Sequence, residues 1–325
     1  MAINAKFQSK SDVEVYIGTE ITMGTATLHN TSGAFKLLPV VDYSISDIQA
    51  PLGVAPQRAG SFGQQESGAR HDRTQQMFEI SLTMHGTAGV IDRMCLALFG
   101  DGDGNNDLLG SMPTVTKYEH SQSNIVPVTL LFKNGGTNSN DLHYLSAMCT
   151  SLEMSYGLGA DGGALSCTAT FVTGYLPVQS TFGTLTSPTT GAGVVLNIND
   201  MDIQSLGGQD ILINDFSLNI SRSVTRISYQ ASTFAPYGYS IGMYEVTGTV
   251  GCKRDANSNT IATNTGAGIA LNVGKASTFE VTCPDVMIES LGTETADEGW
   301  KHSFGYRAFY ADASDTASIV KIETA

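Results

Sequence analysis

Two short stretches of the sequence decide the fold. Residues 78–84 read FEISLTM, and residues 244–250 read YEVTGTV. In each stretch apolar and polar residues alternate, so every second side chain lies on the same side of an extended chain. The alternation predicts β-strands that bury one face and expose the other.

Each of these stretches belongs to an ordered set that occurs twice. Residues 42–46 (DYSIS) precede the first stretch, and residues 215–219 (DFSLN) precede the second. Downstream, ADGG at 160–163 and ADEG at 296–299 each separate two further strand candidates, as hairpin turns do. The repeated order indicates a duplicated unit; chance similarity between Ser/Thr-rich strands is the alternative.

Duplication makes a specific expectation about register. Tyr43 should overlie Phe216, and Phe78 should overlie Tyr244. The composition agrees with two units, because 325 residues suffice for two domains, and 35 glycines with only 15% charged residues favour short strands joined by turns.

We therefore predict a mainly β chain with two tandem modules of the β-sandwich or open-barrel type, each with at most one short helix. The predicted boundaries are an N-terminal arm at residues 1–35, a first module at 36–175, a linker at 176–202 and a second module at 203–325. The linker assignment follows from its content of Thr, Ser, Gly and Pro.

One helix is predicted in the first module, at residues 88–99. Its apolar residues follow the three-four spacing of a helix face, Thr87 can cap its start, and Gly100 suits the position after its end. The corresponding stretch of the second module, residues 255–263, predicts at most a short turn of helix.

Two long segments lie between the paired strand candidates, at residues 49–77 and 221–243, where a hairpin needs only about two to five residues. Arginine and aromatic residues, which are enriched at protein interfaces, gather there, and the alternative is a solvated loop. The candidate interface residues are Arg58, Arg70, Arg73, Arg222, Arg226, Tyr229, Phe234, Tyr237 and Tyr239. A candidate acidic partner for them is the turn that holds Asp101, Asp103 and Asp107.

The charge balance disfavours tight binding to nucleic acid. A formal net charge of -14, from 31 acidic and 17 basic residues, repels phosphate. No apolar run is long enough to cross a membrane, and the first ten residues contain no apolar leader, so we expect a protein that is made and assembled in a cytosol.

Residue patterns give no support to catalysis or to a bound cofactor. The five cysteines form no CxxC pair and are expected to be buried free thiols. The GLGADG run at 157–162 fits a dinucleotide fingerprint, yet a strand rather than a helix is expected after it. The DGDGN run at 101–105 imitates a calcium loop but has Asn106 and Met112 where that loop needs Gly and Glu. No histidines stand at metal-ligand spacing.

The order of strand, long loop, strand, helix and closing hairpin resembles the tail tube proteins of long-tailed bacteriophages. The closing run carries the resemblance: FEVTCPDV at 279–286, the turn at 296–299, and the aromatic strand at 300–310. The resemblance covers residues 35–174 and 203–323. This chain departs from the family by duplicating the module and by its weak second helix.

The resemblance implies a non-catalytic virion protein whose sheets join those of its neighbours in stacked rings, forming a tube for DNA ejection. Implied partners are the protein itself, the tape measure protein and the tail terminator, with DNA passing through without tight binding. It also implies residence in the virion tail and assembly in the host cytoplasm. Because one-module members form six-fold rings, a chain with two modules is expected to form a ring of three copies. The alternative class is a surface-exposed β-sandwich protein, such as a capsid decoration or carbohydrate-binding module.

Overall fold

The protein is mainly β in the computed structural model, as the alternating pattern predicts. The structure describes residues 13–20, 23–24, 35–47, 53–54, 71–72, 77–100, 127–134, 141–157, 161–180, 189–190, 193–227, 236–263, 268–296, 299–309 and 319–324. Apart from the small pair β4 (Gly53–Val54) and β5 (His71–Asp72), the described strands are linked in one 17-stranded sheet. Within the described part of the chain no helix is both long and apolar enough to span a membrane.

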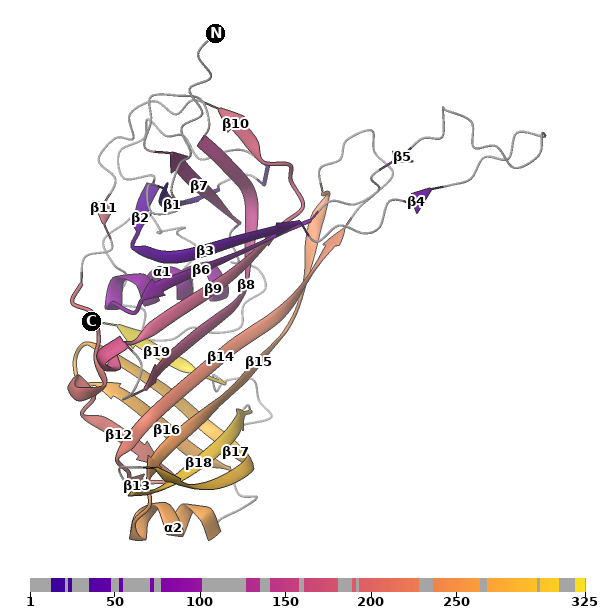
Figure 1. Cartoon of the computed structure of the whole chain (residues 1–325). Coiled ribbons are helices and arrows are strands. Elements are labelled where there is room, and N and C mark those ends of the chain that lie inside the picture. The colour runs from indigo at the N-terminus through magenta and orange to yellow at the C-terminus, as the bar shows by residue number, and fades with distance from the viewer. Residues whose placement is uncertain are drawn as a thin grey trace.

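The largest part of this sheet is a layer of antiparallel strands that runs through both halves of the chain (Figure 1). We call it the long layer. In spatial order it contains β3 (Val40–Asp47), β6 (Phe78–His85), β9 (Ser166–Thr173), β8 (Asp141–Gly157), β14 (Ile213–Ile227), β15 (Gly238–Lys253), β18 (Gly299–Ala308) and β17 (Phe279–Ala296).

Two strands, β8 and β17, leave the long layer and enter a short layer with their N-terminal parts. The first short layer holds β11 (Thr189–Thr190), β2 (Phe35–Leu38), β1 (Val13–Thr19), β7 (Val128–Asn134), the start of β8 and β10 (Val178–Ser180). The second holds β13 (Gln209–Asp210), β12 (Ile203–Leu206), β16 (Ile269–Lys275), the start of β17 and β19 (Lys321–Thr324). Each short layer covers one half of the long layer.

The hydrophobic core lies between the long layer and the elements that cover it. In β6 the side chains of Ile80, Leu82 and Met84 are fully buried, whereas the polar residues between them are only partly buried. Apart from a small separate cluster of Tyr16, Phe35 and Leu131, the buried apolar side chains of both halves form one continuous cluster. The two halves therefore share a core instead of folding around separate ones.

The strand order is the same in the two halves. In the long layer, β3, β6, β9 and β8 pair in the same sequence as β14, β15, β18 and β17. The β-bulges also occur at matching places in the two sets of ladders. The matching steps are Val40/Asp42 with Ile213/Asp215, Val128/Leu130 with Ile269/Leu271, and Cys149/Ser151 with Ile288/Ser290.

The register corrects one expected correspondence. Met84 lies opposite Val40 and Cys252 lies opposite Ile213, and Val40 and Ile213 each precede the first shared bulge. Counting six residues back from each, Phe78 corresponds to Val246, so its expected correspondence to Tyr244 is wrong by two residues. A strand pattern with a period of two cannot detect such a shift, because the shift leaves every side chain on its own face.

The helix prediction for the first half is confirmed. Helix α1 spans Ala88–Phe99, the Thr87 Oγ1 accepts a hydrogen bond from the Val90 N–H at 3.2 Å, and Gly100 follows with φ 82, a conformation that favours glycine. Helix α2, Ala256–Thr263, is a two-turn helix and so exceeds the single turn expected from its weak pattern. Asp255 caps it by accepting the Ser258 N–H at 2.9 Å.

Two segments outside the predicted modules contain strands of the sheet. Residues 13–19, expected within an N-terminal arm, form β1, which lies between β2 and β7. The segment expected as a linker at 176–202 contributes β10 beside β8 and β11 beside β2. Backbone groups at these edges gain hydrogen-bond partners, which a composition rich in Ser, Thr and Gly does not reveal.

Candidate functional site

The uncovered face of the long layer is polar and acidic. Strand alternation directs residues such as Ser81, Thr83, Thr168 and Ser217 away from the core, and hydroxyl pairs cross neighbouring strands, as between Thr83 and Thr168 at 3.2 Å. We call this surface the polar face. Its acidic members are Asp42, Glu79, Glu153, Asp215, Glu245, Glu289 and Glu294, and its basic members are Lys253, Lys301 and Arg307.

Two of the basic groups on the polar face are held by acidic neighbours. The Arg307 guanidinium donates to Glu289 at 2.7 Å and also bonds Glu245, and these contacts raise the pKa of the arginine, the Glu289 hydrogen bond most of all. Lys301 lies 3.9 Å from Asp215. Because these cations are paired, the polar face keeps a net negative character.

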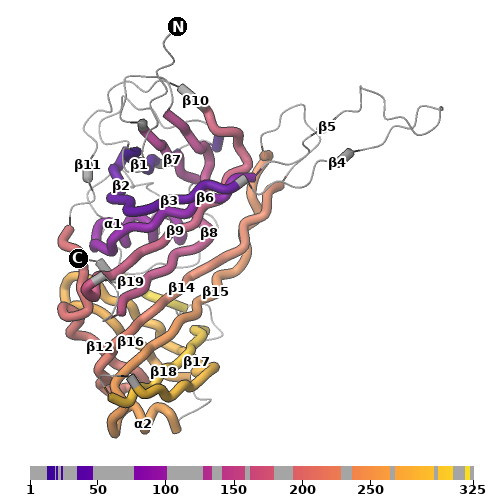
Figure 2. Tube along the Cα trace, viewed as in Figure 1, coloured from indigo at the N-terminus to yellow at the C-terminus, as the bar shows by residue number. Residues whose placement is uncertain are grey.

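A ladder between β8 and β14 joins the two halves within the long layer (Figure 2). It runs from Ser151 opposite Ser221 to Gly157 opposite Asp215. On the core side, the rings of Tyr156 and Phe216 lie 5.5 Å apart. We call this ladder the internal joint.

A buried arginine reinforces the internal joint. Arg222, which is 5% exposed, donates from Nε to the Cys149 carbonyl at 3.0 Å and from Nη1 to the Tyr244 hydroxyl at 2.8 Å. The Tyr244 hydroxyl in turn donates to the Leu98 carbonyl at 2.7 Å. Side chains of the second half therefore satisfy backbone acceptors of the first.

The far end of the β14–β15 hairpin also contacts the first half. The Gly174 N–H donates to the Tyr239 hydroxyl oxygen at 2.9 Å, and Arg226 Nη1 donates to the Gly174 carbonyl at 3.5 Å. The Tyr175 hydroxyl donates to the Pro236 carbonyl at 3.4 Å. This hairpin extends well beyond the other strands of its own half (Figure 1).

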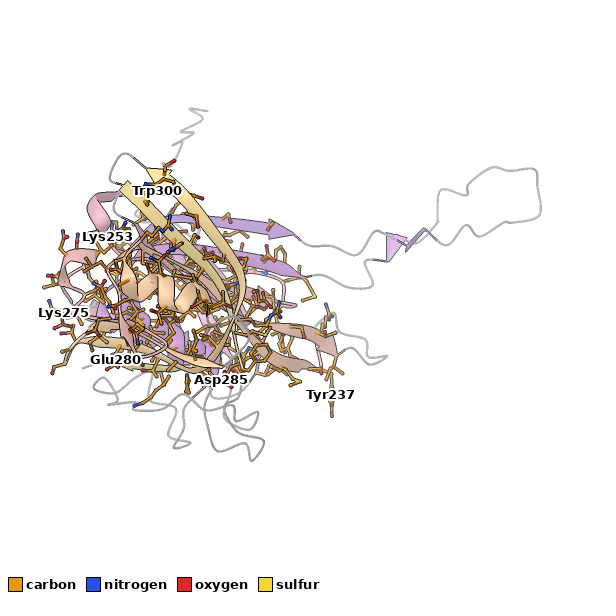
Figure 3. All side chains as sticks on the ribbon, turned by 90° about the horizontal axis from the view of Figure 1, so that it is seen from below. Tyr237, Lys253, Lys275, Glu280, Asp285 and Trp300 are labelled. Carbon is orange, nitrogen blue, oxygen red and sulfur yellow. The ribbon has the colours of Figure 1, made fainter. Side chains whose placement is uncertain are left out.

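The structure divides the sequence-predicted interface residues into three groups. Arg222, Arg226 and Tyr239 bind the other half of the same chain, and Tyr237 is exposed at the hairpin end (Figure 3). The remaining candidates lie outside the described residues: Arg58, Arg70, Arg73, Tyr229, Phe234, Asp101, Asp103 and Asp107. Sequence reasoning missed the interface role of Tyr244, because its place in an alternating strand indicated only core.

The long layer ends in two edges that have no described strand beside them, β3 at one end and the C-terminal part of β17 at the other. The bulges match β17 to β8, so Leu291 corresponds to Leu152 and Met287 to Met148. Leu152 and Met148 are 0% and 4% exposed, whereas Leu291 and Met287 are 44% and 39% exposed. The uncovered apolar side chains mark the β17 edge as an unfilled contact.

The expectation of buried free thiols is confirmed. All five cysteines are free and buried, and burial raises the pKa of Cys149, Cys167, Cys252 and Cys283 to about 12. Among the described residues, no group of His, Cys, Asp and Glu is arranged to hold a metal ion.

The described strands form one continuous sheet with a polar face and with no described strand beside either end of the long layer, an arrangement suited to side-by-side assembly. The family model described as phage tail tube protein matches residues 10–308, nearly the whole chain. The chain therefore belongs to the phage tail tube protein family, and its family membership makes it a structural component of the virion tail that self-assembles. Comparison with curated proteins finds no match.

Proposed function

We propose that three copies of this chain close into a ring, and that rings stack into a tube through which DNA leaves the virion. The observation that carries the proposal is one continuous layer whose two end strands, β3 and the C-terminal part of β17, have no described strand beside them. Unpaired edges promote association, and a head-to-tail contact between unlike edges closes a ring when the rotation per copy is fixed.

The internal joint supplies a template for the contact between chains. The matching bulges equate β3 with β14 and β17 with β8, so a ladder between β17 of one chain and β3 of the next would repeat the ladder between β8 and β14. Ser155 lies opposite Ser217 in the internal joint. Transferring the register places Glu294 of one chain opposite Ser44 of the next.

The ring size follows from the two matching halves in each chain. If the joint within the chain and the joint between chains share one geometry, each half turns the sheet by the same angle. One-module members of the family form six-fold rings, and three chains of two modules close the same circle. The ring has true three-fold and approximate six-fold symmetry, and the chain contains a duplicated tube module.

The polar face supports a role as the lining of the tube. Acidic side chains repel phosphate, and hydroxyl side chains carry no charge that would attract it. The cations of Arg307 and Lys301 are already paired with carboxylates. DNA would pass along such a lining without tight binding.

Other parts of the chain would serve contacts beyond the ring. Tyr237 and the arginines at Arg58, Arg70 and Arg73 are proposed to meet neighbouring chains or rings, with the turn at Asp101, Asp103 and Asp107 as a candidate partner. Tape measure and tail terminator proteins are the proposed further partners, and the host cytoplasm the proposed place of assembly.

Electron microscopy and mass measurement of the purified protein test the ring. Tubes or stacked discs with three chains per disc are expected. Six chains per disc, or a monomer that stays unassociated at high concentration, would overturn the model.

Cysteine cross-linking tests the register separately. The double variant Ser44→Cys with Glu294→Cys should form disulfides between chains, because side chains directly opposite in an antiparallel ladder lie about 5 Å apart. The matched control pairs Ser44→Cys with Gly292→Cys, which lies two residues out of register. The buried native cysteines contribute little background. Equal cross-linking in both variants would refute the transferred register.

A further inference from the structure

The segment that leads into the second half closes one end of the first half. The Leu196 N–H donates to the Gly86 carbonyl at 2.9 Å, and the Leu196 carbonyl accepts the Leu165 N–H at 2.8 Å. Gly86 in turn donates to the Leu165 carbonyl at 2.6 Å. Leu165 and Leu196 are 0% and 3% exposed, so the three residues form a sealed end of the core.

The second half repeats the backbone contact between Gly86 and Leu165, but no described residue packs over it as Leu196 does in the first half. Arg254 lies two residues after Cys252, as Gly86 lies two residues after Met84, and the Arg254 N–H donates to the Trp300 carbonyl at 2.9 Å. Trp300 therefore stands where Leu165 stands in the first half. Among the described residues nothing takes the place of Leu196.

The Trp300 side chain is exposed to solvent at this end of the second half. It is 57% exposed, although its first-half counterpart is fully buried, and the Arg254 guanidinium lies 5.4 Å from the centre of its ring. Figure 3 looks onto this end of the molecule, with α2 across it and Trp300 on the β17–β18 hairpin at its margin.

The N-terminal segment has an apolar residue at the position that corresponds to Leu196. Leu271 and Leu130 each follow the matching bulge, so they correspond to each other. Leu206 of β12 pairs with Leu271 and Ile17 of β1 pairs with Leu130, so Leu206 corresponds to Ile17. Leu196 precedes Leu206 by ten residues. Counting ten residues back from Ile17 reaches Phe7, a large apolar residue in a segment of mostly small and polar ones.

We propose that the end of the second half formed by Trp300 and Arg254 binds the segment around Phe7 of a second copy of this chain. The inference rests on the proposed ring, in which β3 of the next chain takes the place of β14. The segment that precedes β1 of that chain then takes the place of the segment that precedes β12. Phe7 would pack on Trp300 as Leu196 packs on Leu165, with its backbone paired to Trp300 and Arg254.

The chain contains a single tryptophan, so its fluorescence reports on this contact directly. On passing from dilute protein to tubes, the Trp300 emission should shift to shorter wavelength and become less sensitive to acrylamide. Tubes of the Phe7→Ala variant should lose both changes. The matched control Lys10→Ala, in the same segment, should keep them.

The outcomes separate this inference from the proposed function. Tubes whose Trp300 emission stays at the value of the dilute protein, or shifts equally in Phe7→Ala, would overturn the inference and leave the tube intact. Failure of the parent protein to assemble at all would overturn both.

Where Phe7→Ala does not assemble, a disulfide between chains of the Phe7→Cys, Trp300→Cys double variant decides the matter. Its presence in tubes supports the contact, and its absence from tubes refutes it. The single Phe7→Cys variant is the control for non-specific disulfides.

Discussion

Strands β8 and β17 hold matching positions in the two halves, yet one is covered and the other is open. Leu152 of β8 is buried beneath the internal joint, and its counterpart Leu291 of β17 is 44% exposed. Their ladders share a bulge at the same step. A single chain therefore contains both a filled contact and an unfilled version of it.

The comparison teaches what an open edge of this protein needs. In the filled contact, β14 supplies a paired strand and Arg222 with Tyr244 supplies hydrogen bonds to backbone carbonyls. At the open contact no described strand lies beside the C-terminal part of β17, and the side chains of Leu291 and Met287 are 44% and 39% exposed. The difference lies in the covering elements and not in the strand itself.

The largest expected effect comes from the same substitution at the two matching positions. Leu152→Asp should destabilise the fold by on the order of 4 kcal/mol, because it buries a carboxylate without a partner. Leu291→Asp should change the free energy of unfolding by no more than about 0.5 kcal/mol, since the site is exposed in the single chain. Urea unfolding measures both.

At the open edge, tube formation should be far more sensitive than folding to the substitution of Leu291. Leu291→Asp should prevent tube formation while the chain remains folded. A Leu291→Asp variant that is as unstable as Leu152→Asp, or that forms normal tubes, would show that the two edges are not equivalent.

Arg222 and Arg226, two arginines of the second half that bind backbone carbonyls of the first half, should give the next largest difference in the free energy of unfolding. Arg222→Ala removes two hydrogen bonds from a buried guanidinium and should cost about 3 kcal/mol. Arg226→Ala, which is only partly buried and bonds the Gly174 carbonyl at 3.5 Å, should cost about 1 kcal/mol. Chemical denaturation of the two variants gives the difference, and equal losses would contradict the assignment of Arg222 as the anchor.

The helix caps provide a smaller comparison between the halves. Thr87→Ala and Asp255→Ala should each cost about 1 kcal/mol, because each removes the acceptor for a helix N–H. The Asp255 backbone N–H, which binds Ser258 Oγ at 2.8 Å, is kept in the Ala variant, so the two losses should be similar. Thermal unfolding of both variants measures this, with Thr260→Ala on the exposed face of α2 as a control.

The smallest expected difference is in the unfolding of the halves. Because the core is continuous, the cysteines of both halves should become reactive toward thiol reagents at the same denaturant concentration. Earlier labelling of Cys252 and Cys283 than of Cys149 and Cys167 would mean that the second half opens alone.

Alkaline pH should weaken both halves in the same way. Folding raises the pKa of these thiols from the ordinary 9.0 to about 12. The folded state then prefers the protonated thiol, so the contribution of these thiols to stability is fully present below pH 9 and is lost as pH rises toward 12. Urea unfolding at a series of pH values measures the loss.

Sequence reasoning was strongest where one residue pattern implies one local structure. The alternation in residues 78–84 predicted β6, and the three-four spacing with Thr87 and Gly100 predicted α1 to the residue. It was weaker for α2, whose cap at Asp255 was a better signal than its faint apolar face. It missed β1 as an integral strand, because neighbours distant in the sequence provide its hydrogen bonds.

The sequence by itself determined which faces of the strands are buried, because that depends only on the order of apolar and polar residues. The tertiary structure alone decided the register of the ladders, since a shift of two residues leaves the pattern unchanged and only bulges and pairing fix it. It also decided which edge is covered. Leu152 and Leu291 are the same residue in similar strands, and the elements placed on β8, β14 and α1 among them, bury one of the two.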